Sequence, residues 1–171
     1  MPNHCKNRVD FFSDKHTTLV ELVELFYDRQ QLETKLFGHF IPEPDWSKTP
    51  LNENTEIEET LQGNPSAKPI GEVGELPVYV KNKRGETELI FKSTGQIDER
   101  WYDWRRNNWG TKWDCYELEI DDTEMPDSFR VTFDTAWSPP VNICNAIRQK
   151  YSDLSVQWHY DEPLMQISGY L

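Results

Sequence analysis

The amino-acid sequence predicts an α+β fold, in which two helices pack on one face of an antiparallel sheet. Two stretches of the 171 residues have helical periodicity, and five others have the features of strands, three of them with clear alternation of apolar and polar residues. A chain of this length forms one domain, or one domain with a sizeable insertion. Hydrophobic residues make up 36% of the chain and aromatic residues 13%, which excludes a wholly disordered protein.

The first predicted unit is a strand followed by a helix. Residues 7–12 are rich in apolar side chains and bounded by polar ones, as in a strand. Ser13 or Asp14 is expected to cap the helix, because a side-chain oxygen there accepts an unpaired backbone N–H. The helix is expected to end near Arg29. Its inward face carries the apolar residues at i, i+3, i+4 and i+7, namely Leu19, Leu22, Val23 and Phe26.

Residues 41–99 interrupt this pattern and are expected to form an insertion within a single domain that spans residues 1–171. Six of the eleven prolines and five of the eight glycines lie here. Prolines disfavour long regular elements because they lack a backbone donor. Residues 52–69 are acidic and polar, and they predict an irregular loop. Residues 76–80 and 88–91 flank a turn-forming stretch and are expected to form a small hairpin.

The C-terminal third contains the clearest patterns. Residues 116–121 alternate apolar and acidic side chains, and residues 129–133 alternate again after a turn, which predicts a hairpin with one buried face. Ser138 and the two prolines after it predict a helix start, with Ser138 as the cap and Pro139 as the first helical residue. The inward face of this helix is expected to carry Ile143, Cys144, Ile147 and Tyr151.

Two further strands are expected at the end of the chain, over residues 154–160 and around Met165 and Ile167. The predicted order is therefore β-α-(insertion)-β-β-α-β-β. Its first six elements have the order βαββαβ, the split arrangement of ferredoxin-like folds. We predict a ferredoxin-like sheet with two helices on one face and an extra C-terminal strand.

Charge is distributed unevenly along the chain. Thirty acidic and eighteen basic residues give a net charge of -12, and residues 114–171 alone carry eleven acidic and three basic residues. Such a chain is repelled by phosphate backbones, so direct binding of nucleic acid is disfavoured. By contrast, residues 100–113 carry four basic residues, one acidic residue and four of the seven tryptophans. We call residues 100–113 the Trp/Arg segment.

The Trp/Arg segment has two interpretations. Aromatic rings beside cations are typical of protein interfaces, and also of sites where nucleotides or single strands stack. On this interpretation the binding residues are Trp101, Trp104, Arg105, Arg106, Asn108, Trp109 and Lys112. The structural interpretation is that the tryptophans close one end of the sheet, with the arginines stacked over their rings. The structural interpretation predicts that the tryptophans are buried.

A second candidate surface is acidic. Glu117, Glu119 and Asp121 alternate with apolar residues, so their carboxylates are expected on the open face of the sheet, away from the helices. They form either an ordinary hydrated surface or a row of charges that imitates a phosphate backbone. In the second case they would occupy the basic groove of a nucleic-acid-binding protein.

The other side chains expected on the open face argue against RNA recognition. RNA-binding modules of this topology need aromatic side chains on the central strands. The residues expected there are Asp10, Arg130, Thr132 and Asp134. Asp134 and His159 are a conceivable acid–base pair, but no serine or cysteine at a suitable spacing completes a nucleophilic arrangement.

Metal and cofactor patterns are missing from the sequence. The four histidines have no metal-ligand spacing. Cys5, Cys115 and Cys144 are too widely spaced for a disulfide framework or an iron–sulfur cluster. We expect no cofactor and no metal, and an enzyme is the less favoured class.

The chain lacks the signals of membrane insertion. No apolar run approaches the roughly 20 residues of a membrane-spanning helix. The N-terminus has no apolar signal-peptide core. We expect a cytoplasmic protein with no membrane partner, and the sequence gives no indication of its oligomeric state.

Several motifs occur together in this chain. Residues 1–4 read MPNH, residues 40–44 FIPEP, residues 108–114 NWGTKWD and residues 134–140 DTAWSPP. With these motifs the chain resembles the YubB-like ferredoxin-domain family, proteins of unassigned activity encoded on plasmids, phages and neighbouring bacterial regions. The resemblance spans nearly the whole chain except residues 45–97. It implies a ferredoxin-like sheet and a mobile-element source, and it carries over no catalytic residue.

These observations lead to two hypotheses. The first is a non-enzymatic binding protein of a mobile genetic element that acts by protein–protein contact. It would inhibit a host nuclease or another host-defence component through its acidic surface and the Trp/Arg segment. The alternative is a nucleotide- or nucleic-acid-binding module, or an enzyme acting on such a ligand, that uses the Trp/Arg segment.

Overall fold

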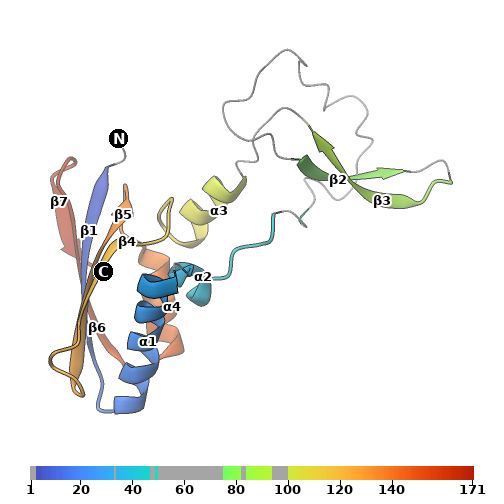
Figure 1. Cartoon of the computed structure of the whole chain (residues 1–171). Coiled ribbons are helices and arrows are strands. Elements are labelled where there is room, and N and C mark those ends of the chain that lie inside the picture. Colours follow the sequence, from blue (N-terminus) through green and yellow to red (C-terminus); the bar gives the residue numbers. More distant parts are fainter. Residues whose placement is uncertain (1–2, 33, 47–48, 50–74, 82–83, 94–99) are drawn as a thin grey trace. The chain divides into compact units, whose positions relative to one another are not determined.

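The computed structural model describes residues 3–32, 34–46, 49, 75–81, 84–93 and 100–171. The chain divides into two compact units. Unit 1 consists of Met1–Glu43 with Tyr102–Leu171, and unit 2 consists of Pro44–Trp101. The strands and helices of the predicted split arrangement all lie in unit 1 (Figure 1).

Unit 1 contains a five-stranded sheet in which all neighbouring strands are antiparallel. In spatial order the strands are β4 (Tyr116–Asp121), β5 (Ser128–Ala136), β1 (His4–Phe12), β6 (Ser155–Glu162) and β7 (Ile167–Tyr170). Strand β1 lies between β5 and β6, which is the strand order of a split βαβ unit. The predicted ferredoxin-like α+β class is therefore confirmed, and β7 is the extra C-terminal strand.

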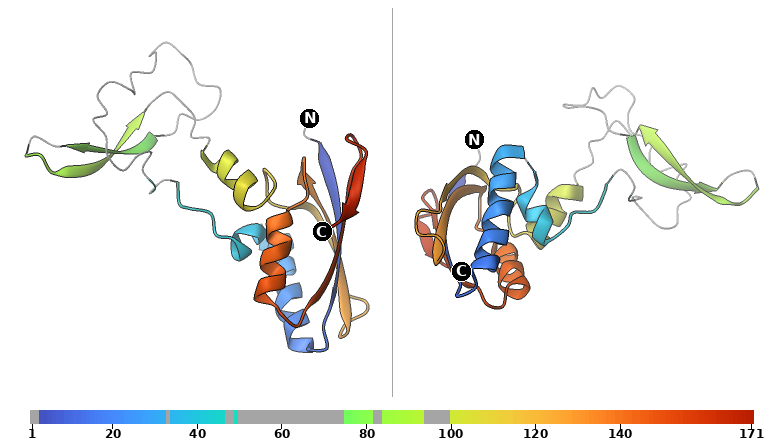
Figure 2. Two further views of the ribbon diagram at one scale, coloured as in Figure 1. Left: turned by 180° about the vertical axis from the view of Figure 1, so that it is seen from behind. Right: turned by 60° about the horizontal axis from the view of Figure 1, so that its bottom comes forward.

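Helices cover one face of this sheet, as the two views in Figure 2 show. The covering helices are α1 (His16–Leu32) and α4 (Val141–Lys150), and the short α2 (Leu36–Phe40) packs beside them. The remaining helix, α3 (Arg100–Asn108), begins in unit 2 and continues into unit 1. Within the described ranges, no helix is both long enough and apolar enough to cross a membrane.

The apolar core of unit 1 lies between the sheet and its helices. The predicted inward residues of both helical stripes are buried: Leu19, Leu22, Val23, Phe26, Ile143, Cys144, Ile147 and Tyr151. Phe11 of β1 stacks on Phe129 of β5 with ring centroids 4.8 Å apart, and the Phe26 ring of α1 lies 5.7 Å from Phe11. Each fully buried side chain of this size stabilises the fold by about 1.5–3 kcal/mol. This cluster therefore joins two strands to the first helix.

The start of α1 differs from the prediction. The helix begins at His16, and the Ser13 hydroxyl accepts a hydrogen bond from the Lys15 N–H (3.0 Å) in the preceding turn. The hydroxyls of Ser13 and Thr18 both donate to the Asp153 carboxylate (3.2 and 2.7 Å). Ser13 therefore connects the turn before α1 to the turn between α4 and β6 instead of serving as a simple cap.

The start of α4 also corrects the prediction. The helix begins at Val141, so Pro139 is not its first residue, and Ser138 does not cap it. The Ser138 hydroxyl instead donates to the Gly110 carbonyl (2.6 Å). Gly110 has φ +88°, and a Cβ there would lie 3.1 Å from the Val141 nitrogen. This close approach of two backbones, which the sequence pattern did not indicate, displaces the helix start.

Two strand boundaries differ as well. β1 begins at His4, earlier than the predicted residues 7–12. Met165, expected in the last strand, lies in the turn before β7, because its N–H donates to the Glu162 carboxylate and closes that turn. Met165 and Ile167 are both about half exposed, at 55% and 49%.

Unit 2 contains the strands β2 (Glu75–Lys81) and β3 (Thr87–Ser93), which pair antiparallel where the sequence predicts a hairpin. The Arg100 guanidinium lies 5.2 Å from the centroid of the Trp46 ring and donates to the Thr49 carbonyl (2.8 Å). The loop predicted over residues 52–69 lies outside the described residues.

Candidate functional site

The Trp109 ring of the Trp/Arg segment belongs to the core. It has no exposed surface, and its indole Nε1–H donates to the Ile41 carbonyl (2.9 Å). Its ring meets the rings of Phe37 and Trp104 edge-on at 5.8 and 5.9 Å. A ring enclosed in this way has no free face for a partner, so Trp109 is removed from the predicted binding residues.

Arg105 has a structural role beside that ring. Its guanidinium donates to both oxygens of the Glu43 carboxylate (3.0 and 2.7 Å) and lies 4.8 Å from the Trp109 ring centroid. Only 17% of the Arg105 side chain and 7% of the Glu43 side chain are exposed. A two-bond arginine–carboxylate pair of this kind fixes geometry strongly. Arg105 is therefore engaged within the protein, as the structural interpretation expects.

Trp101, Trp104 and Asn108 lie on α3, as do Arg105 and Arg106. Trp101 and Trp104 are partly buried, and the Asn108 side-chain amide donates to the Trp104 carbonyl one turn earlier (2.9 Å). Asn108 thus satisfies the end of its own helix. Burial of the tryptophans is complete for Trp109 and partial for Trp101, Trp104 and Trp113.

The remaining predicted cations of the segment stack on aromatic rings. The Lys112 ammonium lies 5.3 Å from the Tyr102 ring centroid and 4.9 Å from that of Trp113, and the Arg106 guanidinium lies 5.5 Å from Tyr102. These are ordinary cation–π distances. The segment therefore divides into a buried part around Trp109 and a surface group of Tyr102, Arg106, Lys112 and Trp113.

The predicted acidic residues lie where the sequence placed them. Glu117, Glu119 and Asp121 are all exposed along β4. The pairing of β4 with β5 shifts between Tyr116 and Glu119, and Glu117 has φ 50°, so β4 contains a bulge there. The Asp121 carboxylate accepts hydrogen bonds from the Thr123 hydroxyl and N–H, which lower the pKa of that carboxyl.

Glu117 and Glu119 line an open groove of about 430 Å³ on the uncovered face of the sheet. Its charged residues come from four strands, and they are Lys6, Arg8, Glu117, Glu119, Asp134 and Asp161. Asn7, Thr132, Phe133 and His159 complete its lining. We call this set the open-face groove. Four carboxylates and two bases give it an acidic balance, which a basic partner would complement.

Next to the groove, a group of charged residues is neutralised within the protein. The Asp10 carboxylate pairs with the Arg130 guanidinium (2.5 Å) and lies 3.8 Å from that of Arg8. Exposed pairs of this kind contribute little stability, typically ~0–1 kcal/mol. Arg8 also lines the groove, so it connects this pair to the groove.

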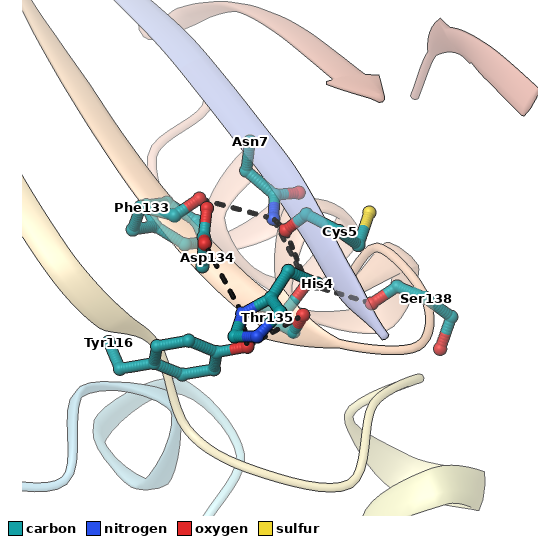
Figure 3. A network of polar contacts seen from close by, with 8 residues as sticks. All are labelled: His4, Cys5, Asn7, Tyr116, Phe133, Asp134, Thr135 and Ser138. Carbon is teal, nitrogen blue, oxygen red and sulfur yellow. Dashed lines mark hydrogen bonds and ion pairs between the residues drawn. The ribbon is translucent and has the colours of Figure 1, made fainter. Parts of the chain in front are cut away.

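A second polar cluster lies at the end of β1 that is close to the groove (Figure 3). The Nδ1 atom of His4 is 2.9 Å from the Tyr116 hydroxyl and 3.5 Å from the Asp134 carboxylate, and the Tyr116 hydroxyl donates to the Thr135 carbonyl (3.3 Å). Partial burial raises the pKa of Asp134, against the opposing effect of His4 and Lys6. Burial and the Asp134 charge also raise the pKa of the Tyr116 hydroxyl.

Asp134 and His159, which the sequence analysis considered as an acid–base pair, do not form one. Asp134 on β5 and His159 on β6 both line the groove, but β1 lies between them. Lys6 of β1 is directly opposite Asp134, whereas Arg8 is opposite His159. Asp134 instead approaches His4, and the ring of His159 packs edge-on against Tyr170 at 5.1 Å. The His4 partner was not identified from the sequence, because the contact joins residues 130 positions apart.

The described residues offer little for nucleophilic or metal chemistry at this site. No group of three histidine, cysteine or carboxylate side chains among them could hold a metal ion. Cys5 is fully buried, and burial raises the pKa of its thiol to about 11, so the thiol stays protonated near neutral pH.

The fold and the site define a ferredoxin-like α+β protein whose sheet has one helix-covered face and one charged, exposed face. Residues 112–171 match a protein-family model described as the ferredoxin-like domain in Api92-like protein. No curated protein matches the chain.

The structure is also similar to the crystal structure of the protein api92 from Yersinia pseudotuberculosis, with a TM-score of 0.53 and 12% sequence identity. This similarity covers 99% of the present chain and 93% of api92. At this identity it shows a shared fold alone. The ferredoxin-like part of the resemblance found in the sequence is thus supported, and the YubB-like name is not confirmed.

Proposed function

We propose that this chain is a non-enzymatic binding protein that uses the open-face groove to contact a basic surface on a partner protein. The observation that carries the proposal is the gathering of Glu117, Glu119, Asp134 and Asp161 around one groove on the face that α1 and α4 leave uncovered. An acidic groove is complementary to a basic surface, and proteins that bind phosphate backbones have such basic surfaces. Together with the mobile-element source that the sequence resemblance implies, this favours a nuclease or another host-defence component as the partner class, inhibited by an acidic imitation of nucleic acid.

The sheet holds this charge array on a fixed scaffold. Neighbouring strands of a sheet are about 4.8 Å apart, and the bulge of β4 sets the positions of Glu117 and Glu119 relative to β5. Side chains on such a scaffold need little backbone ordering on binding, which lowers the entropic cost of association. A rigid array of carboxylates is suited to a rigid basic groove.

Electrostatics would act mainly on recognition and on the rate of association. Complementary charge steers two proteins together and disfavours wrong partners. With a Debye length of about 8 Å at physiological salt, exposed carboxylates act over short distances only. Binding through the open-face groove is therefore expected to weaken steeply as salt is raised.

Affinity capture from a bacterial host lysate tests the proposal with two matched double variants. Glu117→Gln/Glu119→Gln removes two carboxylates from the groove. Glu24→Gln/Asp28→Asn removes two exposed carboxylates from α1, on the helical side. A basic partner should be retained by the wild type and by the α1 variant at about 0.15 M salt and lost by the groove variant. Equal retention by both variants, or no enriched partner with the wild type, would count against the proposal.

The surface group of the Trp/Arg segment supports a second candidate function, binding of a nucleotide base. Its supporting observation is that Arg106 and Lys112 both lie over the Tyr102 ring, with Trp113 beside Lys112. A base could stack there in place of one cation. Tryptophan fluorescence titrated with ATP and with a short single-stranded oligonucleotide tests this candidate. An unchanged signal in the wild type would remove it.

A further inference from the structure

The two edge strands of the sheet are protected to very different degrees. An edge strand presents unpaired backbone groups, and proteins shield such edges with charges, bulges or a covering element. β4 has all three: its acidic residues, its bulge, and side chains from α1 that reach its backbone. Arg29 donates to the Cys115 carbonyl (2.8 Å) and Gln30 to the Leu118 carbonyl (3.0 Å).

β7, at the opposite edge, has no charged side chain and no bulge. Among the described residues, the one helix contact to its end, from Arg148 of α4 to the Leu171 carbonyl (3.0 Å), lies on the side of Leu171 that faces β6. No residue from Pro163 to Leu171 is charged, in a chain whose charged residues make up 28%. Ile167 is 49% exposed and Tyr170 is 70% exposed. The turn before β7 is held in place by the buried Glu162, whose carboxylate accepts the Met165 N–H. The strand thus has no charged side chain, and its preceding turn is fixed by a hydrogen bond from a buried residue.

The register shows which backbone groups of β7 are available. The Leu171 N–H donates to the Trp158 carbonyl, so the backbone N–H and C=O groups of Leu171 point toward β6. Because peptide groups alternate along an antiparallel strand, Gly169 also faces β6, whereas Ser168 and Tyr170 direct their N–H and C=O groups to the outer edge. Two residues of β7 therefore offer four unpaired backbone groups.

We propose that the outer edge of β7 pairs antiparallel with β7 of a second copy of this chain. In the symmetric register, Ser168 lies opposite Tyr170 of the second copy, and the two-fold axis passes through Gly169. This register satisfies all four outer backbone groups of each copy and places Ile167 opposite Leu171 of the second copy. The two sheets would become one continuous ten-stranded sheet.

Charge decides which edge can accept a second copy. In a dimer paired through β7, the strands nearest the interface that carry acidic residues are the two β6 strands. The two β7 strands lie between them, so they are three strand spacings apart, or roughly 14 Å. That distance exceeds the Debye length of about 8 Å at physiological salt. Pairing through β4 would instead bring two rows of carboxylates within one spacing of about 5 Å. A like-charged copy is therefore compatible with β7 and incompatible with β4.

The matched variants Ser168→Pro and Ser168→Ala test this proposal. Proline is tolerated in an edge strand where its nitrogen faces outward, so Ser168→Pro removes an outer N–H without disturbing the pairing with β6. Ser168→Ala changes the side chain but keeps that N–H. Tyr170→Lys is a third variant that adds edge charge at an exposed position. Urea unfolding of each variant shows whether the monomer fold is retained.

Sedimentation velocity of the wild-type chain up to about 100 µM, a range that detects weak dimers, gives the readout. The proposal predicts a wild-type dimer that Ser168→Ala retains and that Ser168→Pro and Tyr170→Lys weaken at least about tenfold. It also predicts that salt does not weaken this dimer, unlike binding through the open-face groove. A wild-type monomer at all concentrations, or a dimer that Ser168→Pro leaves unchanged, would overturn it.

Discussion

The two faces of the sheet use charged and aromatic residues in opposite ways. On the helix-covered side, Arg105 is paired with Glu43 and Trp109 is enclosed, so these residues hold the fold together. On the open side, Glu117 and Glu119 are exposed and line a groove. Within the Trp/Arg segment, Arg105 and Trp109 thus have a structural role. The less conspicuous alternation of β4 forms the surface that is available to a partner.

The largest expected loss of stability comes from a substitution in the buried core, at Trp109. Trp109→Ala removes a fully enclosed ring and its hydrogen bond to Ile41, and it should lower the free energy of unfolding by about 3–5 kcal/mol. The control Trp137→Ala removes a ring that is 48% exposed and should therefore cost clearly less than Trp109→Ala. Urea unfolding followed by circular dichroism measures both. Equal losses for the two variants would contradict the division of roles.

A somewhat smaller effect is expected at Asn7, a buried polar residue of β1. Its side-chain amide donates to the Cys5 carbonyl and the Thr135 hydroxyl (both 3.0 Å), and its oxygen accepts from the Trp158 indole (3.0 Å). Asn7→Leu leaves buried partners unsatisfied and should cost about 2 kcal/mol. Asn145→Leu, at an exposed position of α4, is the control and should stay within about 0.5 kcal/mol of wild type.

Local periodicity explains which parts could be predicted from the sequence. The alternation over residues 116–121 and 129–133 and the stripe of α4 depend on neighbouring residues only, and the structure confirms them. The choice between a buried and a binding role for Trp109 depends on Ile41, which is 68 positions away. No local pattern reports such a contact.

The cluster of His4, Tyr116 and Asp134 was missed for the same reason. It forms because β5 lies between β1 and β4 in the sheet, which brings residues 112 positions apart into hydrogen-bonding distance. The helix-start errors have a related cause. Ser138 has the residue type of a cap, but its hydroxyl bonds to Gly110, which packs there through tertiary structure.

A modest pH effect is expected on the open face. Because partial burial raises the folded-state pKa of Asp134 above the ordinary value of 3.8, its ionisation disfavours the folded state. The stabilising contribution of Asp134 is therefore fully present below pH 3.8 and is lost as pH rises through its folded-state pKa. Subtracting the unfolding free energy of Asp134→Asn from that of wild type, between pH 3 and 7, should give a difference that falls with pH. A difference that rises with pH would contradict this sign.

The smallest stability effect is expected for Glu117→Gln/Glu119→Gln. Both side chains are exposed, so the free energy of unfolding should stay within about 0.5 kcal/mol of wild type. Thermal unfolding checks this expectation. A large loss of stability would show that these carboxylates support the fold, and it would remove the contrast between the two faces.

The measurement that tests the central claim most directly is the dissociation constant of a captured partner, compared among the wild type and the two carboxylate variants. The open-face groove predicts at least a tenfold weaker complex, or about 1.4 kcal/mol, for Glu117→Gln/Glu119→Gln. It predicts less than a twofold change for Glu24→Gln/Asp28→Asn. Similar losses for both variants would show that net charge alone attracts the partner. Wild-type affinity in the groove variant would place the binding surface elsewhere.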